Sequence, residues 1–174
     1  MNKYLLPFFF ICTIAMMLVM GKTGAVLKTD TTPLGILNLE FAYNSTKTHE
    51  VINAWSQTLN ETSGKVPAAE LNTYLDFIFI FFYSGFLFLT CTYMAHIIKG
   101  SAAKAGLLIA KAALLAGFLD VLENTGMLLT LSGHVSDTIA FLTTFVSIIK
   151  WSLAVIAVLY ILTGLLALAY RKLR

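Results

Sequence analysis

The segment Gly117-Phe118-Leu119-Asp120-Val121-Leu122-Glu123-Asn124 places three strongly polar side chains inside an apolar stretch that runs from about residue 105 to 131. A stretch of that length can cross a bilayer as a helix. Spacings of three and four residues put Asp120, Glu123 and Asn124 on one helix face. Because a carboxylate in hydrocarbon costs at least ~2.5–3.5 kcal/mol, we expect these groups to face a protein interior or a wet cavity.

Small residues along the same helix indicate independently which face is buried. They recur at spacings of three and four residues, at Ala102, Gly106, Ala110, Ala113 and Gly117. Such spacing lets helix backbones approach closely in lipid. The stripe continues to Asp120 and Asn124, so the carboxylate and the amide are predicted to point toward neighbouring helices.

The composition of the whole chain indicates an integral membrane protein in contact with lipids. Of its 174 residues, 58% are hydrophobic and only 12% are charged, which is unusual for a soluble protein. The net charge of +3 is explained by lysines and arginines that flank the apolar runs. We therefore expect no nucleic-acid partner.

Four apolar runs predict an all-α membrane protein, a four-transmembrane-helix bundle that forms a single domain over residues 1–174. The predicted membrane helices cover residues 4–20, 74–98, 105–131 and 138–170. Residues 101–104 are expected to form a tight turn before the third of them. Between the first and second, residues 22–73 are polar and are predicted to form a helical extracytoplasmic segment.

The first apolar run has an alternative interpretation. A basic start, an apolar centre and the small residues near Thr23-Gly24-Ala25 also fit a secretory signal peptide. The apolar centre is longer than that of a typical signal, so we favour a retained helix, with cleavage as the alternative.

Two short elements are expected in the polar segment. Residues 33–42 form an amphipathic element that places Glu40 near the outer mouth of the bundle, with Ile36, Leu37, Leu39 and Phe41 as apolar anchors. A second helix is expected to be capped by Ser45 or Thr46. Its apolar stripe comprises Val51, Ile52, Trp55 and Leu59. Residues 60–67 have the composition of a loop.

Polar side chains of the other membrane helices are predicted to meet the carboxylates. With 1.5 Å of rise per residue, Asp120, Lys150 and Tyr83 lie roughly 14–18 Å from the outer ends of their helices, and Glu123 roughly 12 Å. An ion pair of Lys150 with Asp120 or Glu123 would offset the cost of burying each charge. The predicted pocket comprises Glu40, Asp76, Tyr83, Asp120, Glu123, Asn124 and Lys150.

No cofactor or metal site is predicted. Cys12 and Cys91 lie at unequal depths and form no metal-binding motif, so they are interpreted as packing residues. His96 and His134 fall at opposite ends of the predicted bundle and cannot share a haem or a metal ion.

The sequence leaves three functions open, and it does not decide whether the protein is an enzyme. The pocket can bind or process a small molecule or a lipid, with a carboxylate as acid or base and Lys150 stabilising negative charge. The same carboxylates can translocate protons or cations. A non-catalytic assembly or partner-binding role is the third, and small-residue helix faces can also join copies of the chain in a homo-oligomer.

The positive charges predict an orientation. Six basic residues fall on one side if both termini are cytoplasmic and residues 22–73 lie outside, although that outer segment carries four lysines together with acidic residues. These basic residues are Lys3, Lys99, Lys104, Arg171, Lys172 and Arg174.

Several short patterns resemble a group of uncharacterised bacterial four-helix integral membrane proteins. They are residues 35–42, Ala54-Trp55, Leu75-Asp76-Phe77 with Tyr83, and the Leu-Asp-x-Leu-Glu-Asn motif at residues 119–124. The resemblance covers most of the chain and implies a bacterial inner membrane location. It implies no activity.

Overall fold

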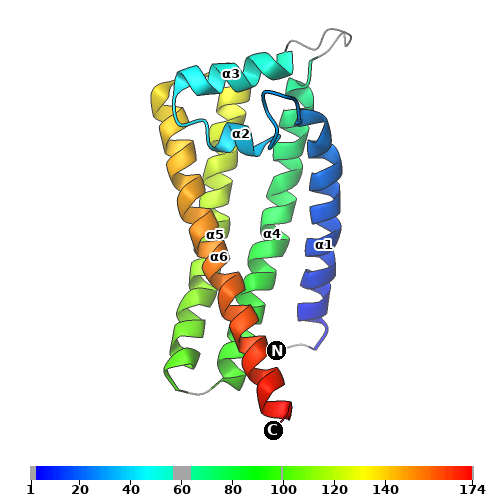
Figure 1. The fold of residues 1–174 in the computed structure, drawn as a ribbon, viewed down its shortest axis with the longest axis vertical. Coiled ribbons are helices and arrows are strands. Elements are labelled where there is room, and N and C mark those ends of the chain that lie inside the picture. The colour runs from blue at the N-terminus through cyan, green and yellow to red at the C-terminus, as the bar shows by residue number, and fades with distance from the viewer. Residues whose placement is uncertain (1–2, 57–63, 99, 174) are drawn as a thin grey trace.

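The computed structural model describes residues 3–56, 64–98 and 100–173. Within these residues all regular secondary structure is helical (Figure 1). The helices are α1 (Leu5–Gly24), the 3-10 turn η1 (Ala25–Leu27), α2 (Leu37–Glu40), α3 (Ser45–Ser56), α4 (Val66–Ile97), α5 (Ser101–Leu131) and α6 (Asp137–Leu173).

Four of the described helical segments are long and apolar enough to cross a membrane: α1 together with η1, α4, α5 and α6. They run along the long axis of the molecule, with α4 packed on α5, α5 on α6, and α1 on α4 (Figure 1). The predicted all-α class with four helices of spanning length is confirmed. The short helices α2 and α3 cover one end, here called the capped end, and both termini lie toward the opposite end.

Two predicted boundaries are wrong. The helix α4 begins at Val66 rather than at residue 74, with Pro67 in its first turn, where the missing N–H has no helical partner to lose. Residues 101–104 are not a tight turn but the first turn of α5. The chain reverses just before them, where Gly100 has a φ of +79°, a conformation that glycine adopts without strain.

The capped end is held together by its own core. Trp55 of α3 is fully buried, and its Nε1 donates hydrogen bonds to the backbone oxygen of Leu27, at 2.9 Å, and to Thr32 Oγ1, at 3.2 Å. The surrounding cluster is Leu27, Leu39, Val51, Trp55, Ala69, Met127 and Leu131, so it joins the cap to α4 and α5.

Both predicted elements of the polar segment are present. The helix α2 lies within residues 33–42, and α3 buries Val51 and Trp55 from its predicted stripe. The cap of α3 is Asn44, whose Oδ1 accepts a hydrogen bond from the Lys47 backbone N–H at 2.8 Å, rather than Ser45 or Thr46. Leu59 and residues 60–63 of the predicted loop lie outside the described residues.

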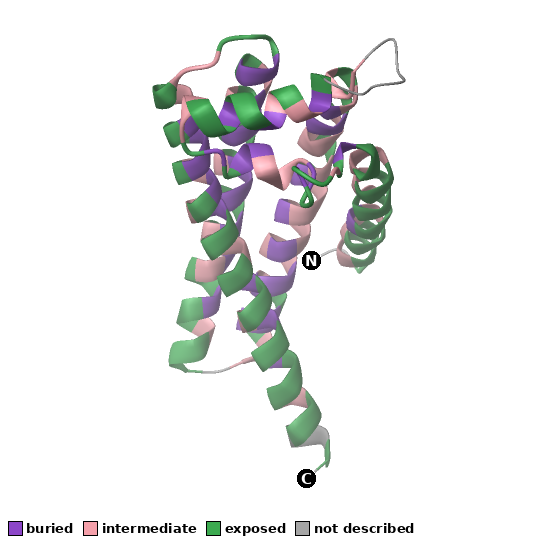
Figure 2. Cartoon of the chain, turned by 45° about the horizontal axis from the view of Figure 1, so that its top comes forward, coloured by how far each residue is buried: buried purple, intermediate pink, exposed green. Residues whose placement is uncertain are grey.

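The bundle is packed unevenly. Buried residues gather on the faces that α4, α5 and α6 turn toward one another, whereas α1 is mostly exposed (Figure 2). From the predicted stripe of α5, Gly106, Ala110, Ala113 and Gly117 are buried, and only Ala102 is exposed. A Cβ atom on Gly117 would lie 2.7 Å from Ser84 Cβ, so the glycine permits the approach of α4 to α5 that places Tyr83 beside Asp120.

Candidate functional site

Lys150 of α6 lies at the centre of a buried ionic cluster in the capped half of the bundle. Its Nζ is 2.6 Å from Asp120 Oδ1, 2.9 Å from Glu123 Oε1 and 3.6 Å from Glu40 Oε2. The four side chains are at most 8% exposed. The predicted ion pair of Lys150 with Asp120 or Glu123 therefore forms with both, and a third carboxylate joins it.

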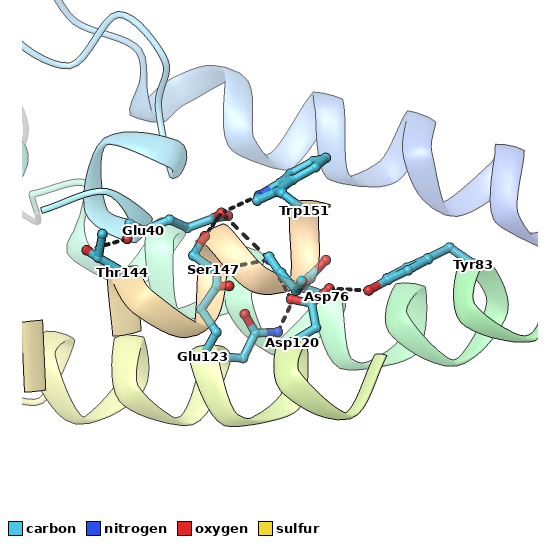
Figure 3. A network of polar contacts seen from close by, with 10 residues as sticks. Glu40, Asp76, Tyr83, Asp120, Glu123, Thr144, Ser147 and Trp151 are labelled. Atoms are coloured by element: carbon cyan, nitrogen blue, oxygen red, sulfur yellow. Dashed lines mark hydrogen bonds and ion pairs between the residues drawn. The ribbon is translucent and has the colours of Figure 1, made fainter. Parts of the chain in front are cut away.

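Glu40 reaches the cluster from the cap rather than lying at its outer mouth. Its Oε2 accepts hydrogen bonds from Trp151 Nε1, at 3.2 Å, and from Ser147 Oγ, at 3.3 Å (Figure 3). Its backbone oxygen accepts a hydrogen bond from Thr144 Oγ1 at 2.9 Å. Because α2 is only one turn long, these contacts with α6 fix both its backbone and its carboxylate.

The helix α4 contributes two polar side chains. Tyr83 donates a hydrogen bond from its hydroxyl to Asp120 Oδ2 at 2.7 Å, so Asp120 lies between a phenol and an ammonium group. Asp76 Oδ2 accepts a hydrogen bond from Asn124 Nδ2 at 2.8 Å. The structure thus brings all seven residues of the predicted pocket together, through ion pairs and hydrogen bonds that join α2, α4, α5 and α6. Figure 3 shows five of them, Glu40, Asp76, Tyr83, Asp120 and Glu123.

Some buried oxygen atoms of the cluster have no hydrogen-bond partner within the described part of the chain. They are Asn124 Oδ1 and both carboxylate oxygens of Glu123. Glu123 Oε1 lies within ion-pair distance of Lys150 Nζ, but the geometry is not that of a hydrogen bond. Most buried polar atoms in proteins are paired, so the Asn124 oxygen, which borders a cavity, is an acceptor for a further donor, whereas Glu123 does not line that cavity.

A cavity of about 430 Å³ adjoins the cluster. Glu40, Asp76, Asp120, Asn124 and Lys150 line its polar end. The rest of the wall is mainly apolar and includes Phe10, Ile14, Met17, Phe79, Phe86, Leu87, Met127, Trp151, Ala154 and Val158. Most of the cavity surface is therefore hydrocarbon or aromatic, and the charged groups contribute only a small part of it.

The cavity opens on the flank of the bundle between α1 and α6. Ile14 and Met17 of α1 and Trp151 and Val158 of α6 line it, and all four are exposed. The opening exists because α1 packs against α4 and not closely against α6. Phenylalanines make much of that contact, for example Phe9 with Phe81, whose ring centroids are 5.5 Å apart.

The sequence prediction did not connect Glu40 with the residues of α6 that hold it. Thr144, Ser147 and Trp151 are spaced by three and four residues, which puts them on one helix face next to that of Lys150. That spacing was the available signal. This spacing was not recognised as a signal because Thr144 and Trp151 are common residues of membrane helices. Only the fold shows that Glu40 reaches them.

Toward the opposite end of the bundle the packing becomes apolar. Its buried cluster is Leu87, Cys91, Ala110, Ala113, Ala157 and Ile161.

Comparisons with protein-family models, curated proteins and solved structures find no match for this chain. The chemistry of the site is therefore inferred from its own geometry.

Proposed function

We propose that this chain is an integral membrane protein that binds an amphiphilic small molecule or lipid in the cavity beside Lys150. The observation that carries the proposal is the continuity of one cavity from a charged end to an apolar flank. A water-soluble metabolite would make no favourable contacts with the apolar part of the cavity. A purely apolar molecule would make no hydrogen bonds with the five charged or amide groups. A molecule with a polar head and an apolar tail matches both.

The position of the opening supports entry from the bilayer. If α1, α4, α5 and α6 cross a membrane, the gap between α1 and α6 faces lipid, and a tail can enter sideways while the head reaches the cluster. The volume of about 430 Å³ lies within the range of small-molecule sites, roughly 300–1,000 Å³. It suits a head and the first part of a chain better than a whole two-chain lipid.

We further propose an orientation with both termini in the cytoplasm and the capped end outside. Lys3 precedes α1 and Lys104 lies in the first turn of α5, and an excess of basic residues at these helix ends favours a cytoplasmic side. Under this arrangement the cavity takes its ligand from the outer leaflet.

The alternative of proton or cation translocation gains less support. A translocation path needs polar groups or water toward both surfaces. Between the cluster and the opposite end, the described helices pack mainly through apolar residues such as Leu87, Ala110 and Ala113. Ser84 and Thr90 are also buried there, but each hydroxyl donates a hydrogen bond to the backbone of its own helix. A closed ion pair that merely joins helices would not need an adjoining cavity.

The test is mass spectrometry of molecules that copurify with the protein in lipid nanodiscs. Ile14→Trp places an indole ring in the cavity wall, and Ile11→Trp is the matched control because Ile11 is an exposed residue of α1 that does not line the cavity. We expect the same amphiphile with wild type and Ile11→Trp, and its loss from Ile14→Trp. Asp120→Asn should also reduce it. Equal recovery from all four proteins would contradict the proposal.

A further inference from the structure

We propose that the head of the bound amphiphile is a protonated primary amine, held between Asp76 and Asn124. This inference rests on the proposed amphiphile site and names the chemical class of its ligand. Both residues line the polar end of the cavity, and they are joined by the hydrogen bond from Asn124 Nδ2 to Asp76 Oδ2.

The first support is the balance of charge in the cluster. Four carboxyl groups, those of Glu40, Asp76, Asp120 and Glu123, meet a single ammonium group, that of Lys150. Lys150 lies within ion-pair distance of three of them, but Asp76 makes no ion pair with any cation in the described residues. A cationic head beside Asp76 would supply the missing positive charge, whereas an anionic head would add to the repulsion.

The second support is an unpaired acceptor. Asn124 is fully buried, and its Oδ1 has no hydrogen-bond partner within the described residues. Its amide nitrogen already donates to Asp76, so the free oxygen accepts only from a new donor. A primary ammonium group carries three N–H donors and can bind the Asp76 carboxylate and the Asn124 oxygen together. A quaternary ammonium group has no N–H, and a hydroxyl group has no charge.

The surroundings favour an organic cation over a metal ion. Among the described residues no group of three or more histidine, cysteine, aspartate or glutamate side chains is placed to hold a metal ion. The walls next to the polar end are aromatic, with Phe79 and Tyr83 forming a ring pair at 5.2 Å. Aromatic faces attract organic cations, and the apolar remainder of the cavity accommodates an alkyl chain.

The experiment compares head groups on one chain length. The full-length protein in nanodiscs is titrated with dodecylamine, dodecanol and dodecyltrimethylammonium, and the bound fraction is measured by native mass spectrometry against empty nanodiscs. Because hydrogen bonds that involve a charged group are stronger than those between neutral groups, we expect dodecylamine to bind wild type at least about ten-fold more tightly than the other two. In Asp76→Asn the preference should fall to about two-fold or less, whereas the exposed-acid control Asp30→Asn should keep it.

The outcomes separate the two proposals. If the three probes bind wild type equally and Ile14→Trp abolishes all binding, the cavity is correct and the amine is wrong. A preference that persists in Asp76→Asn also overturns the amine assignment. If no probe binds wild type above the empty nanodisc, or if Ile14→Trp changes nothing, the amphiphile site itself fails. The ranking in wild type needs no variant, so it stands even if Asp76→Asn does not fold.

Discussion

The capped half and the opposite half of the bundle use the same three helices for different purposes. In the opposite half, α4, α5 and α6 meet through alanine, leucine, isoleucine and Cys91. In the capped half, the same face of α5 carries Asp120 and Glu123, which contact Lys150, and Asn124, which donates a hydrogen bond to Asp76. Among the described residues, the opposite half therefore joins these helices without a buried charged side chain, whereas the capped half buries four.

The energetics of membrane proteins support this distinction. A hydrogen bond between membrane helices typically contributes only ~0.6–2 kcal/mol, and burying each charge has its own cost. Three carboxylates around one lysine are more than helix association needs. The contrast between the two halves yields four predictions, ordered from the largest effect to the smallest.

Removing the central cation should have the largest effect. Lys150→Met leaves Asp120, Glu123 and Glu40 buried without a positive charge, and we expect the free energy of unfolding to fall by about 3–5 kcal/mol. The control is Lys111→Met, which removes an exposed lysine of α5 and should change it by less than about 0.5 kcal/mol. Denaturant unfolding in detergent provides the measurement. Similar stability of the two variants would show that the cluster is not the ionic unit described.

Separating α4 from α5 should have the next largest effect. Gly117→Ala puts a Cβ atom 2.7 Å from Ser84 Cβ, so one helix must shift, and we expect a loss of about 1–3 kcal/mol. Gly21→Ala is the control because nothing lies within 4 Å of the added atom. The same unfolding experiment compares them. If Gly117→Ala is as stable as Gly21→Ala, the close approach of α4 to α5 at Gly117 is not required for stability.

The close-packed face of α5 and its buried polar groups could both be predicted from the sequence because they lie on one helix. The spacing of small residues in α5 indicates its buried face, and Asp120 and Asn124 continue that spacing. Their convergence with Lys150 and Tyr83 followed from counting residues along antiparallel helices. The spacing of residue types and the distance of a residue from the end of its helix can both be read from the sequence.

The cavity could not be predicted in the same way. It depends on α1 packing against α4 through its phenylalanines while leaving its other side open toward α6, and α1 has no amphipathic pattern that reveals this. The early start of α4 was missed for a related reason. Asn72 and Thr73 look like loop residues, yet Asn72 donates hydrogen bonds to α1 and Thr73 to its own helix, so their polar groups are satisfied inside the fold.

Loss of one hydrogen bond within the capped half should have a smaller effect. Tyr83→Phe removes the donor to Asp120 Oδ2, and we expect the free energy of unfolding to fall by about 1–2 kcal/mol. The control is Tyr93→Phe, which changes an exposed tyrosine on the part of α4 that lies in the opposite half. Thermal unfolding of both variants distinguishes them. An equal response would mean that the Tyr83 hydroxyl is not part of the buried network.

The smallest effect is expected for an ion pair on the exposed cap. Glu50 lies 2.7 Å from the Lys47 ammonium group and raises its pKa by hydrogen bonding and by charge. Whatever this pair contributes is therefore lost as the pH rises through the pKa of Lys47, at alkaline pH. Both groups are solvated, so Lys47→Met should leave the melting temperature at neutral pH unchanged. If Lys47→Met lowered the melting temperature as much as Lys150→Met does, buried and exposed charges would not differ in their contribution to stability.

The most direct measurement is a cryo-electron microscopy map of the protein in lipid nanodiscs. We expect elongated density that begins beside Asp76 and Asn124 and leaves the bundle between Ile14 and Val158. A map in which side chains of α1 and α6 close that gap, with Lys150 and the carboxylates sealed from it, would contradict the account.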